Sequence, residues 1–387
     1  MVYYLSQAIL ERFAGTPQAD LTAWLSAFQS ITLRSAGAAV TALLLTLGFG
    51  RRVIEYLRRY FSQGYVPEAR PEVKSPAEDS SGKKARKKHV PTMGGVLIVG
   101  AIDVSALLWA QLNELVIVTM FSMLGLTFIG VWDDMGKIEG GARRAGLSAR
   151  AKFLAQVAVA ILIVMVLWVY PGRRMLVSDT LVSLGGREAF SFLALLGAAA
   201  SVLLIVGLSN AVNLTDGMDG LAIGCTSIVT GVLVVVTYVA SHAIMADYLK
   251  TPHIQGAGEL TVFTSAMAGA CLGFLWFNCY PAQVFMGDTG ALALGGAIGV
   301  IALLVHRIDV VLIASGVFLA EIGSVVIQVI SSRGSRWLFK RDMRPFLCTP
   351  IHHHFEKLGW EETKIVTRFY IINALFCVAA LAYLKTK

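Results

Sequence analysis

Charged residues are scarce in this chain. Asp, Glu, Lys and Arg make up 15% of its 387 residues and hydrophobic residues make up 56%, whereas soluble domains have about 25% and about 45–50%. Cysteine is also rare: there are five, and four of them lie inside apolar runs, so we expect all five to be unpaired. These shortages argue against a soluble enzyme, a disordered chain and a disulfide-stapled secreted scaffold.

Long apolar stretches take the place of the missing charge, and the mean hydropathy is +0.67. A helix needs about 20 mostly apolar residues to cross the hydrocarbon core of a bilayer. Ten stretches approach this length: 31–50, 94–112, 115–132, 153–170, 190–208, 219–240, 260–280, 289–305, 308–330 and 366–384. The sequence therefore predicts an all-α integral membrane protein, a polytopic bundle of about ten transmembrane helices in a single domain over residues 1–387.

Two segments fall outside this pattern. Residues 1–30 have neither the basic start nor the small-residue cleavage site of a signal peptide, and we expect them to lie at the membrane surface as an amphipathic lead-in. Residues 62–90 combine three prolines with the basic run 83–88, which predicts a flexible, basic cytoplasmic loop.

The basic residues predict the orientation. If the N-terminus lies outside, the cytoplasmic loops together hold 23 lysines and arginines, and the opposite segments hold eight. These loops are 51–90, 133–152, 209–218, 281–288 and 331–364. The asymmetry predicts that both termini lie outside. Loops that face anionic lipid or a phosphorylated substrate also account for the net charge of +8, so we expect no nucleic-acid partner.

Polar side chains gather at the ends of the predicted cytoplasmic spans. Each of the five loops carries such a cluster, within 87–95, 133–137, 210–220, 285–290 and 350–356. The external loops have nothing comparable. We therefore expect one active-site cleft on the cytoplasmic face, where these clusters converge.

The first carboxylate cluster contains the adjacent residues Asp133 and Asp134. They could simply cap or solvate a helix end. Two neighbouring carboxylates repel each other, however, and their position directly after an apolar span favours a bound cation. Lys137 follows Asp133 at i+4 and offers an ion pair if the helix continues.

The second carboxylate cluster is Asp216-Gly-Met-Asp219, whose carboxylates share one face if a helix starts there. N-capping would explain one aspartate, but not two together with Asn210 and Asn213. Mg²⁺ takes oxygen ligands, usually one or two carboxylates plus substrate phosphates and waters. This loop and Asp288, in a Gly-Asp-Thr-Gly turn, therefore predict a magnesium site.

Three consecutive histidines, 352–354, suggest hydrogen bonds to phosphate or proton donation near pH 7. Within the predicted spans, Glu321 and Gln328 lie two helical turns apart on one face, and an intramembrane carboxylate is a functional or bundle-facing candidate. Asp103 has no evident partner, and we expect only that it faces the protein interior.

Together these motifs resemble those of the phospho-N-acetylmuramoyl-pentapeptide transferases, over roughly residues 87–384. The shared motifs occur in the family's order: Pro-Thr-Met-Gly-Gly at 91–95, Asp-Asp-x-x-Lys at 133–137, Asn-Leu-Thr-Asp-Gly-Met-Asp-Gly-Leu-Ala at 213–222, Phe-Met-Gly-Asp at 285–288 and His-His-His-Phe-Glu at 352–356. Each motif alone is a weak signal, but five in order on predicted cytoplasmic loops are a strong one.

The resemblance implies Mg²⁺-dependent transfer of phospho-MurNAc-pentapeptide from UDP-MurNAc-pentapeptide to undecaprenyl phosphate, with release of UMP, by a homodimer in the bacterial inner membrane. The catalytic residues that it implies are Asp133, Asp134, Asp288 and His352, with Asp288 as the metal ligand. The substrate-binding residues that it implies are Lys87, Thr92, Lys137, Asn210, Asn213, Asp216, Asp219, Phe285, Gln328 and His353.

Two assignments stay open. His89 and Val90 stand where the family usually has Gly-Thr, so either Lys87 or Lys88 is the phosphate-contacting lysine. A basic substrate contact in the next loop is either Arg150 or Lys152.

The chemistry favours direct attack by the lipid phosphate. A phosphate monoester has a second pKa of about 6, so it is largely dianionic at pH 7 and needs no strong base. Asp133 would then orient or deprotonate it. A covalent aspartyl-phosphate intermediate is the alternative.

Two other functions are compatible with the sequence. One is a polyprenyl-phosphate GlcNAc-1-phosphate transferase of the same superfamily. The other is a secondary transporter with a carboxylate ion site, although transporter sites lie near the bilayer midplane and these carboxylates gather at one surface. Magnesium-dependent release of UMP would separate a transferase from a transporter.

Overall fold

The computed structural model describes residues 1–14, 23–62, 90–139, 146–169 and 192–385, which form helices and no strand. The helices are α1 (Val2–Phe13), η1 (Ala23–Gln29), α3 (Ile31–Ser62), α5 (Gly95–Trp109), α6 (Glu114–Glu139), α7 (Ala149–Val169), α9 (Phe192–Thr215), α10 (Leu221–Ser241), α11 (Ala243–Tyr248), α12 (Ala257–Asn278), α13 (Gly287–Leu304), α14 (Ile308–Ala314), α15 (Gly316–Phe339), α16 (Ile351–Lys357) and α17 (Glu362–Tyr383).

Nine helices of the described residues are long and apolar enough to cross a membrane: α3, α6, α7, α9, α10, α12, α13, α15 and α17. The prediction of a polytopic helical bundle is therefore confirmed. Two predicted spans differ in detail. The stretch 94–112 forms α5, of only 15 residues, and 308–330 is divided at Ser315 into α14 and α15. The predicted flexible loop falls almost entirely outside the described residues.

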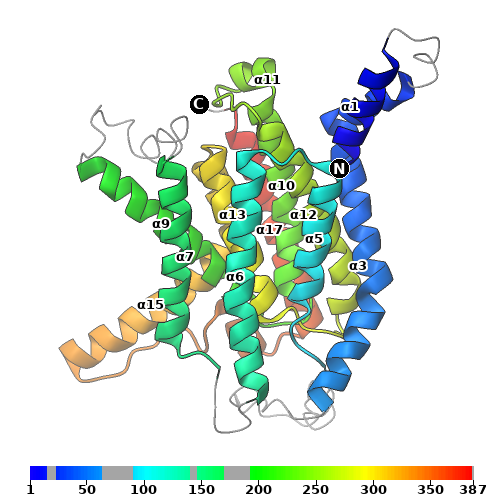
Figure 1. Cartoon of the computed structure of the whole chain (residues 1–387). Helices are drawn as coiled ribbons and strands as arrows, with labels where there is room; N and C mark the ends of the chain where they lie inside the picture. Colours follow the sequence, from blue (N-terminus) through cyan, green and yellow to red (C-terminus); the bar gives the residue numbers. More distant parts are fainter. Residues whose placement is uncertain (15–22, 63–89, 140–145, 170–191, 386–387) are drawn as a thin grey trace.

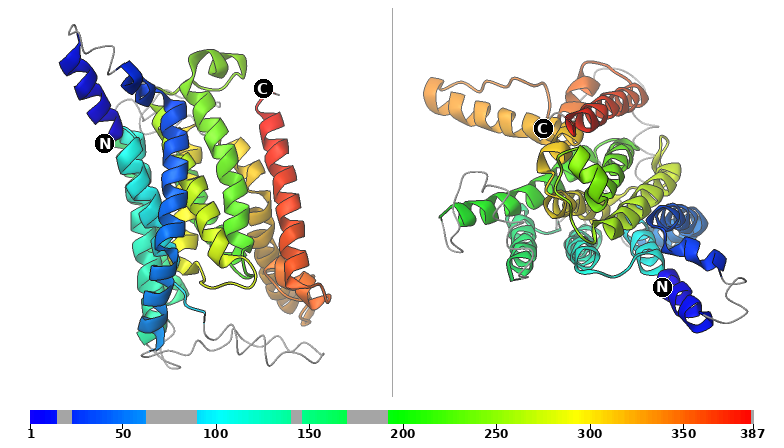
Figure 2. Two further views of the ribbon diagram at one scale, coloured as in Figure 1. Left: turned by 90° about the vertical axis from the view of Figure 1, so that its right-hand side faces the viewer. Right: turned by 90° about the horizontal axis from the view of Figure 1, so that it is seen from above.

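Helices α12 and α13 form the centre of the bundle, and nearly every residue of α13 is buried. Helix α13 packs against α6 and α9, and α12 packs against α3 and α10 (Figures 1 and 2). Small residues allow this close packing. A Cβ on Gly295 of α13, for example, would lie 2.5 Å from the carbonyl oxygen of Leu208 on α9.

Helix α15 projects sideways from the bundle (Figures 1 and 2). Large apolar side chains are exposed on several of its faces, including Trp337, which is 81% exposed. Apolar exposure of this extent on a helix fits contact with lipid rather than with water. All five cysteines are free, as predicted.

The bundle places the predicted polar clusters at one end. Helix α6 runs downward in Figure 1 and ends there, whereas α10 and α13 begin there. The start of α3 and the end of α17 lie toward the upper end. Chain segments separated by more than 150 residues thus meet at the lower end of the molecule.

Candidate active site

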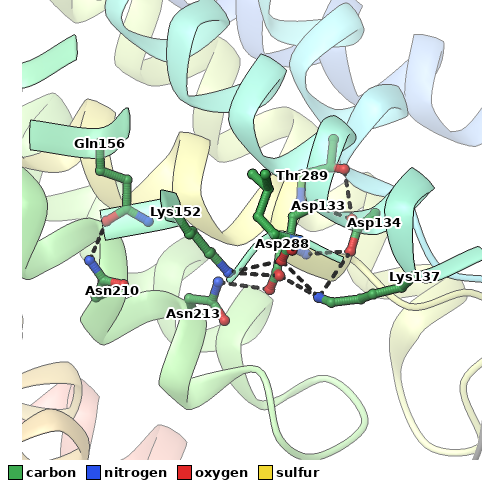
Figure 3. Close-up of polar contacts among 10 residues, drawn as sticks. Asp133, Asp134, Lys137, Lys152, Gln156, Asn210, Asn213, Asp288 and Thr289 are labelled. Carbon is green, nitrogen blue, oxygen red and sulfur yellow. Dashed lines mark hydrogen bonds and ion pairs between the residues drawn. The ribbon is translucent and has the colours of Figure 1, made fainter. Parts of the chain in front are cut away.

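The end of α6 and the first turn of α13 touch at a glycine. A Cβ on Gly130 of α6 would lie 2.5 Å from the carbonyl oxygen of Asp288. Any larger residue would therefore separate the two helices. Because they touch here, Asp133 and Asp134, one turn further along α6, lie beside the carboxylate of Asp288 (Figure 3).

Asp288 is the centre of the resulting network. Its Oδ2 atom lies 2.5 Å from Nζ of Lys137 and 2.7 Å from Nζ of Lys152, and its Oδ1 atom accepts a 2.8 Å hydrogen bond from Nδ2 of Asn213. Its side chain is 14% exposed. Three helices, α6, α7 and α9, therefore supply partners to one carboxylate on a fourth.

Asp133 shares both lysines with Asp288. Its Oδ2 atom lies 2.9 Å from Nζ of Lys137 and 3.3 Å from Nζ of Lys152. Its Oδ1 atom accepts the backbone N–H of Leu147 at 2.8 Å. The i+4 ion pair between Asp133 and Lys137 that the sequence offered is thus present, and the same lysine also reaches Asp288.

Asp134 has a different position from its neighbour. Its carboxylate accepts hydrogen bonds from the hydroxyl and the backbone N–H of Thr289, at 2.7 and 3.1 Å, and from the backbone N–H of Asp288 at 3.4 Å. These backbone donors belong to the first turn of α13, which has no intrahelical partners for them. Asp134 therefore holds the N-terminus of α13 in place.

The arrangement fits a divalent cation. Carboxylate oxygens of Asp133 and Asp288, from two helices, converge on the same two ammonium groups, so a positive charge is already stabilised between them. No group of three or more His, Cys, Asp or Glu side chains in the described part of the chain is arranged to hold a metal. A magnesium ion is usually held by one or two carboxylates together with substrate phosphates and waters, and Asp133 and Asp288 are the carboxylates that could hold one here.

The segment 91–95 lies against the start of α13. The backbone N–H of Phe285 donates to the carbonyl of Pro91 at 2.8 Å, and that of Gly94 donates to the carbonyl of Phe285 at 2.9 Å. A Cβ on Gly287, whose φ is +73°, would lie 2.6 Å from both the Thr92 hydroxyl and Asp134 Oδ2. The predicted residues Thr92 and Phe285 therefore border the network.

The turn 215–220 joins α9 to α10. The Oδ2 atom of Asp219 accepts the backbone N–H of Ala282 at 3.1 Å, and the backbone N–H of Asp219 donates to Oε1 of Glu362 at 3.1 Å. Gly220 has a φ of +82°, and its carbonyl oxygen accepts a 2.7 Å hydrogen bond from the hydroxyl of Tyr370. Asp219 is buried, and Asp216 is half-buried on the same turn.

Other predicted residues make contacts outside the carboxylate network. Asn210 donates to Oε1 of Gln156 at 2.5 Å. Gln328 makes two hydrogen bonds with the backbone of Phe346, at 3.0 and 3.1 Å. The Nδ1 atom of His352 lies 3.0 Å from a carboxylate oxygen of Glu321, and that of His353 lies 2.8 Å from a carboxylate oxygen of Glu356. Lys87 and Lys88 fall outside the described residues.

The structure separates two alternatives that the sequence left open, and it adds residues that sequence patterns did not identify. It distinguishes Lys152, which reaches the carboxylates, from Arg150, which is exposed. Thr289 adjoins a predicted aspartate and could have been noticed from its motif. Glu362 and Tyr370, by contrast, reach the turn from a helix about 150 residues away, and no local pattern signals such a contact.

Comparisons with known proteins identify relatives of this chain. A family profile described as glycosyl transferase family 4 matches residues 116–306. A phospho-N-acetylmuramoyl-pentapeptide-transferase from Methylacidiphilum infernorum is 40% identical over 94% of this chain and 96% of its own length. A protein of the same name from Desulfotalea psychrophila is 40% identical over 100% of this chain and 100% of its own length. Another, from Koribacter versatilis, is 42% identical over 93% of this chain and 94% of its own length.

Proposed function

The chain belongs to the phospho-N-acetylmuramoyl-pentapeptide-transferase family, and we propose that it transfers phospho-MurNAc-pentapeptide from UDP-MurNAc-pentapeptide to undecaprenyl phosphate, giving lipid I and UMP. The observation that carries this proposal is the meeting of Asp133, Asp288, Lys137 and Lys152 at one end of a membrane bundle. Transfer between phosphates depends mainly on positioning and charge neutralisation, and this network provides both.

Asp288, with Asp133 beside it, would hold Mg²⁺. When bound, the ion would neutralise charge on the diphosphate and stabilise UMP as it leaves. Lys137 and Lys152 would then be free to contact phosphate oxygens. Both ammonium groups already lie within 3.3 Å of carboxylate oxygens at this position.

In the proposed reaction, an oxygen of the lipid phosphate attacks the sugar-linked phosphorus of the UDP carrier. A new P–O–P bond forms, and the bond to the UMP oxygen breaks. Asp133 orients the attacking phosphate, and Asp134 keeps α13 and therefore Asp288 in register. Asp216, Asp219 and Phe285 border the nucleotide, together with Thr92, Asn210 and Asn213. Transient labelling of the protein by phosphate would instead indicate an aspartyl-phosphate intermediate.

We also propose that the network faces the cytoplasm and that both termini lie outside, in the bacterial inner membrane. The support is the excess of lysine and arginine in the predicted cytoplasmic loops. The homodimer that the family resemblance implies is a prediction that a single chain does not test.

The decisive assay measures UMP release by the purified protein in detergent with undecaprenyl phosphate and Mg²⁺. Release with UDP-MurNAc-pentapeptide and not with UDP-GlcNAc supports the proposal. Release with UDP-GlcNAc alone would assign the GlcNAc-1-phosphate transferase function instead. Folded protein that is inactive with both nucleotides would refute the transferase function. The transporter alternative would then have to explain why the carboxylates lie at helix ends, because transporter sites lie near the bilayer midplane.

A further inference from the structure

A fully buried hydrogen-bonded pair lies behind the turn 215–220, outside the carboxylate–lysine network. Oε2 of Glu321, on α15, is 3.0 Å from Nδ1 of His352 and 3.5 Å from its backbone nitrogen, at the start of α16. Neither side chain has any exposed surface. Glu321 Oε1 and His352 Nε2 have no hydrogen-bond partner among the described residues. Burial of such groups is costly, so overall stability does not explain the pair.

The other edge of the imidazole lies against the turn. A Cβ on Gly217 would collide with Nε2 of His352. The hydrogen bond between Nδ1 and Glu321 fixes the orientation of the ring. The ring therefore connects α15 to the backbone of the turn that carries Asp216 and Asp219.

The turn is held on its far side as well. Glu362 accepts the backbone N–H of Asp219, and Tyr370 donates to the carbonyl of Gly220. Asn278 accepts the backbone N–H of Gly220 at 3.2 Å. With the far side anchored by these bonds, the close approach of the His352 ring limits where Gly217 can lie.

His352 makes no hydrogen bond or ion pair with Asp133, Asp134 or Asp288 in the described part of the chain. We propose that Glu321 is a positioning residue: it orients His352, and His352 in turn sets the geometry of the turn that binds the nucleotide sugar. This inference rests on the proposed function, because it takes Asp216 and Asp219 as nucleotide contacts. It assigns His352 to substrate binding rather than to proton transfer.

The test compares Glu321→Ala and Glu321→Gln by steady-state kinetics in detergent. For Glu321→Ala we expect the KM for UDP-MurNAc-pentapeptide to rise at least about tenfold, with kcat and the KM for undecaprenyl phosphate within about threefold of the unchanged protein, because only binding is weakened. Glu321→Gln keeps an acceptor for Nδ1–H and should restore a KM close to the original value.

Glu259 provides a matched control. It is also buried, and it is hydrogen-bonded to Arg34 in another part of the bundle. Glu259→Ala should lower thermal stability without raising the KM for the nucleotide. If Glu259→Ala raised this KM as much as Glu321→Ala, general destabilisation would account for both results. That outcome would overturn the proposal.

A second pair of variants covers the case in which Glu321→Ala does not fold. Gly217→Ala should displace the turn and raise the same KM, whereas Gly323→Ala on α15 adds its Cβ in open space and should not. Two results would refute the proposal. In one, Glu321→Ala lowers kcat and leaves the KM for the nucleotide unchanged. In the other, Glu321→Gln raises this KM as much as Glu321→Ala does. If the unchanged protein binds UDP-MurNAc-pentapeptide but releases no UMP, the proposed function fails, and calorimetric Kd values of the same variants still test the positioning role.

Discussion

Asp288 is the residue on which most of the site depends, because three side chains, one from each of three other helices, contact its carboxylate. Asp288→Asn keeps the size of the side chain and removes its charge. We expect turnover to fall by at least about 100-fold, as when a main electrostatic contact of a transition state is lost. The measurement is UMP release at saturating substrate, with circular dichroism as a check of folding. Asp247→Asn, at an exposed position on α11, is the control and should retain full activity.

Lys152 and Arg150 form a natural matched pair two residues apart. Lys152 contacts Asp133 and Asp288, whereas Arg150 is exposed. Lys152→Met removes a charge that would contact phosphate, and kcat/KM should fall about 100-fold. Arg150→Met should change kcat/KM by less than about threefold. Equal effects of the two substitutions would contradict the assignment of Lys152.

Among the helices, the contact of α13 with α9 depends on glycine. A methyl group at Gly295 would meet the carbonyl of Leu208 at 2.5 Å, whereas one at Gly207 would meet nothing within 4 Å. Gly295→Ala should therefore lower the Tm in detergent. Gly207→Ala should leave it unchanged or raise it, since alanine favours a helix over glycine by about 1 kcal/mol. If Gly295→Ala left the Tm unchanged, the close contact between α13 and α9 would not be needed for stability.

Helices α3 and α12 are joined by a buried ion pair. The two terminal guanidinium nitrogens of Arg34, Nη1 and Nη2, donate to the carboxylate of Glu259 at 2.6 and 2.7 Å, and the Arg34 side chain is 1% exposed. Arg34→Met leaves a buried carboxylate unpaired and should cost about 3–5 kcal/mol. Adding Glu259→Leu should recover much of that loss, because an apolar pair needs no desolvation of charge. Thermal unfolding of the single and double variants measures the difference.

For the whole molecule, the proposed orientation can be tested with cysteine. Cys279 is free and exposed, and it precedes the predicted cytoplasmic loop 281–288. In a Cys348→Ser background, a membrane-impermeant maleimide should label Cys279 in inside-out vesicles and not in intact spheroplasts. Asp247 lies between α10 and α12, on the predicted outer side. With Cys279 also replaced by serine, Asp247→Cys should be labelled in intact spheroplasts and not in inside-out vesicles. Labelling of both positions from the same side would refute the orientation.

The sequence alone determined the class of the protein and most of its elements. Apolar stretches of membrane-spanning length are a local property, so they predicted about ten spans, and nine of these contain a helix of spanning length in the described part of the chain. Their boundaries were less certain where the chain bends: a run that reads as one span, 308–330, divides into α14 and α15. Motifs in order also indicated the family, which the relatives over the full chain length confirm.

Only the tertiary structure decided which polar residues meet. Asp133 and Asp134 are equivalent in sequence, yet one shares two lysines with Asp288 and the other holds the first turn of α13. The contact of His352 with Glu321 and Gly217 likewise joins segments up to 135 residues apart. Such contacts depend on how helices pack around small residues, which hydropathy and motif spacing along the chain do not specify.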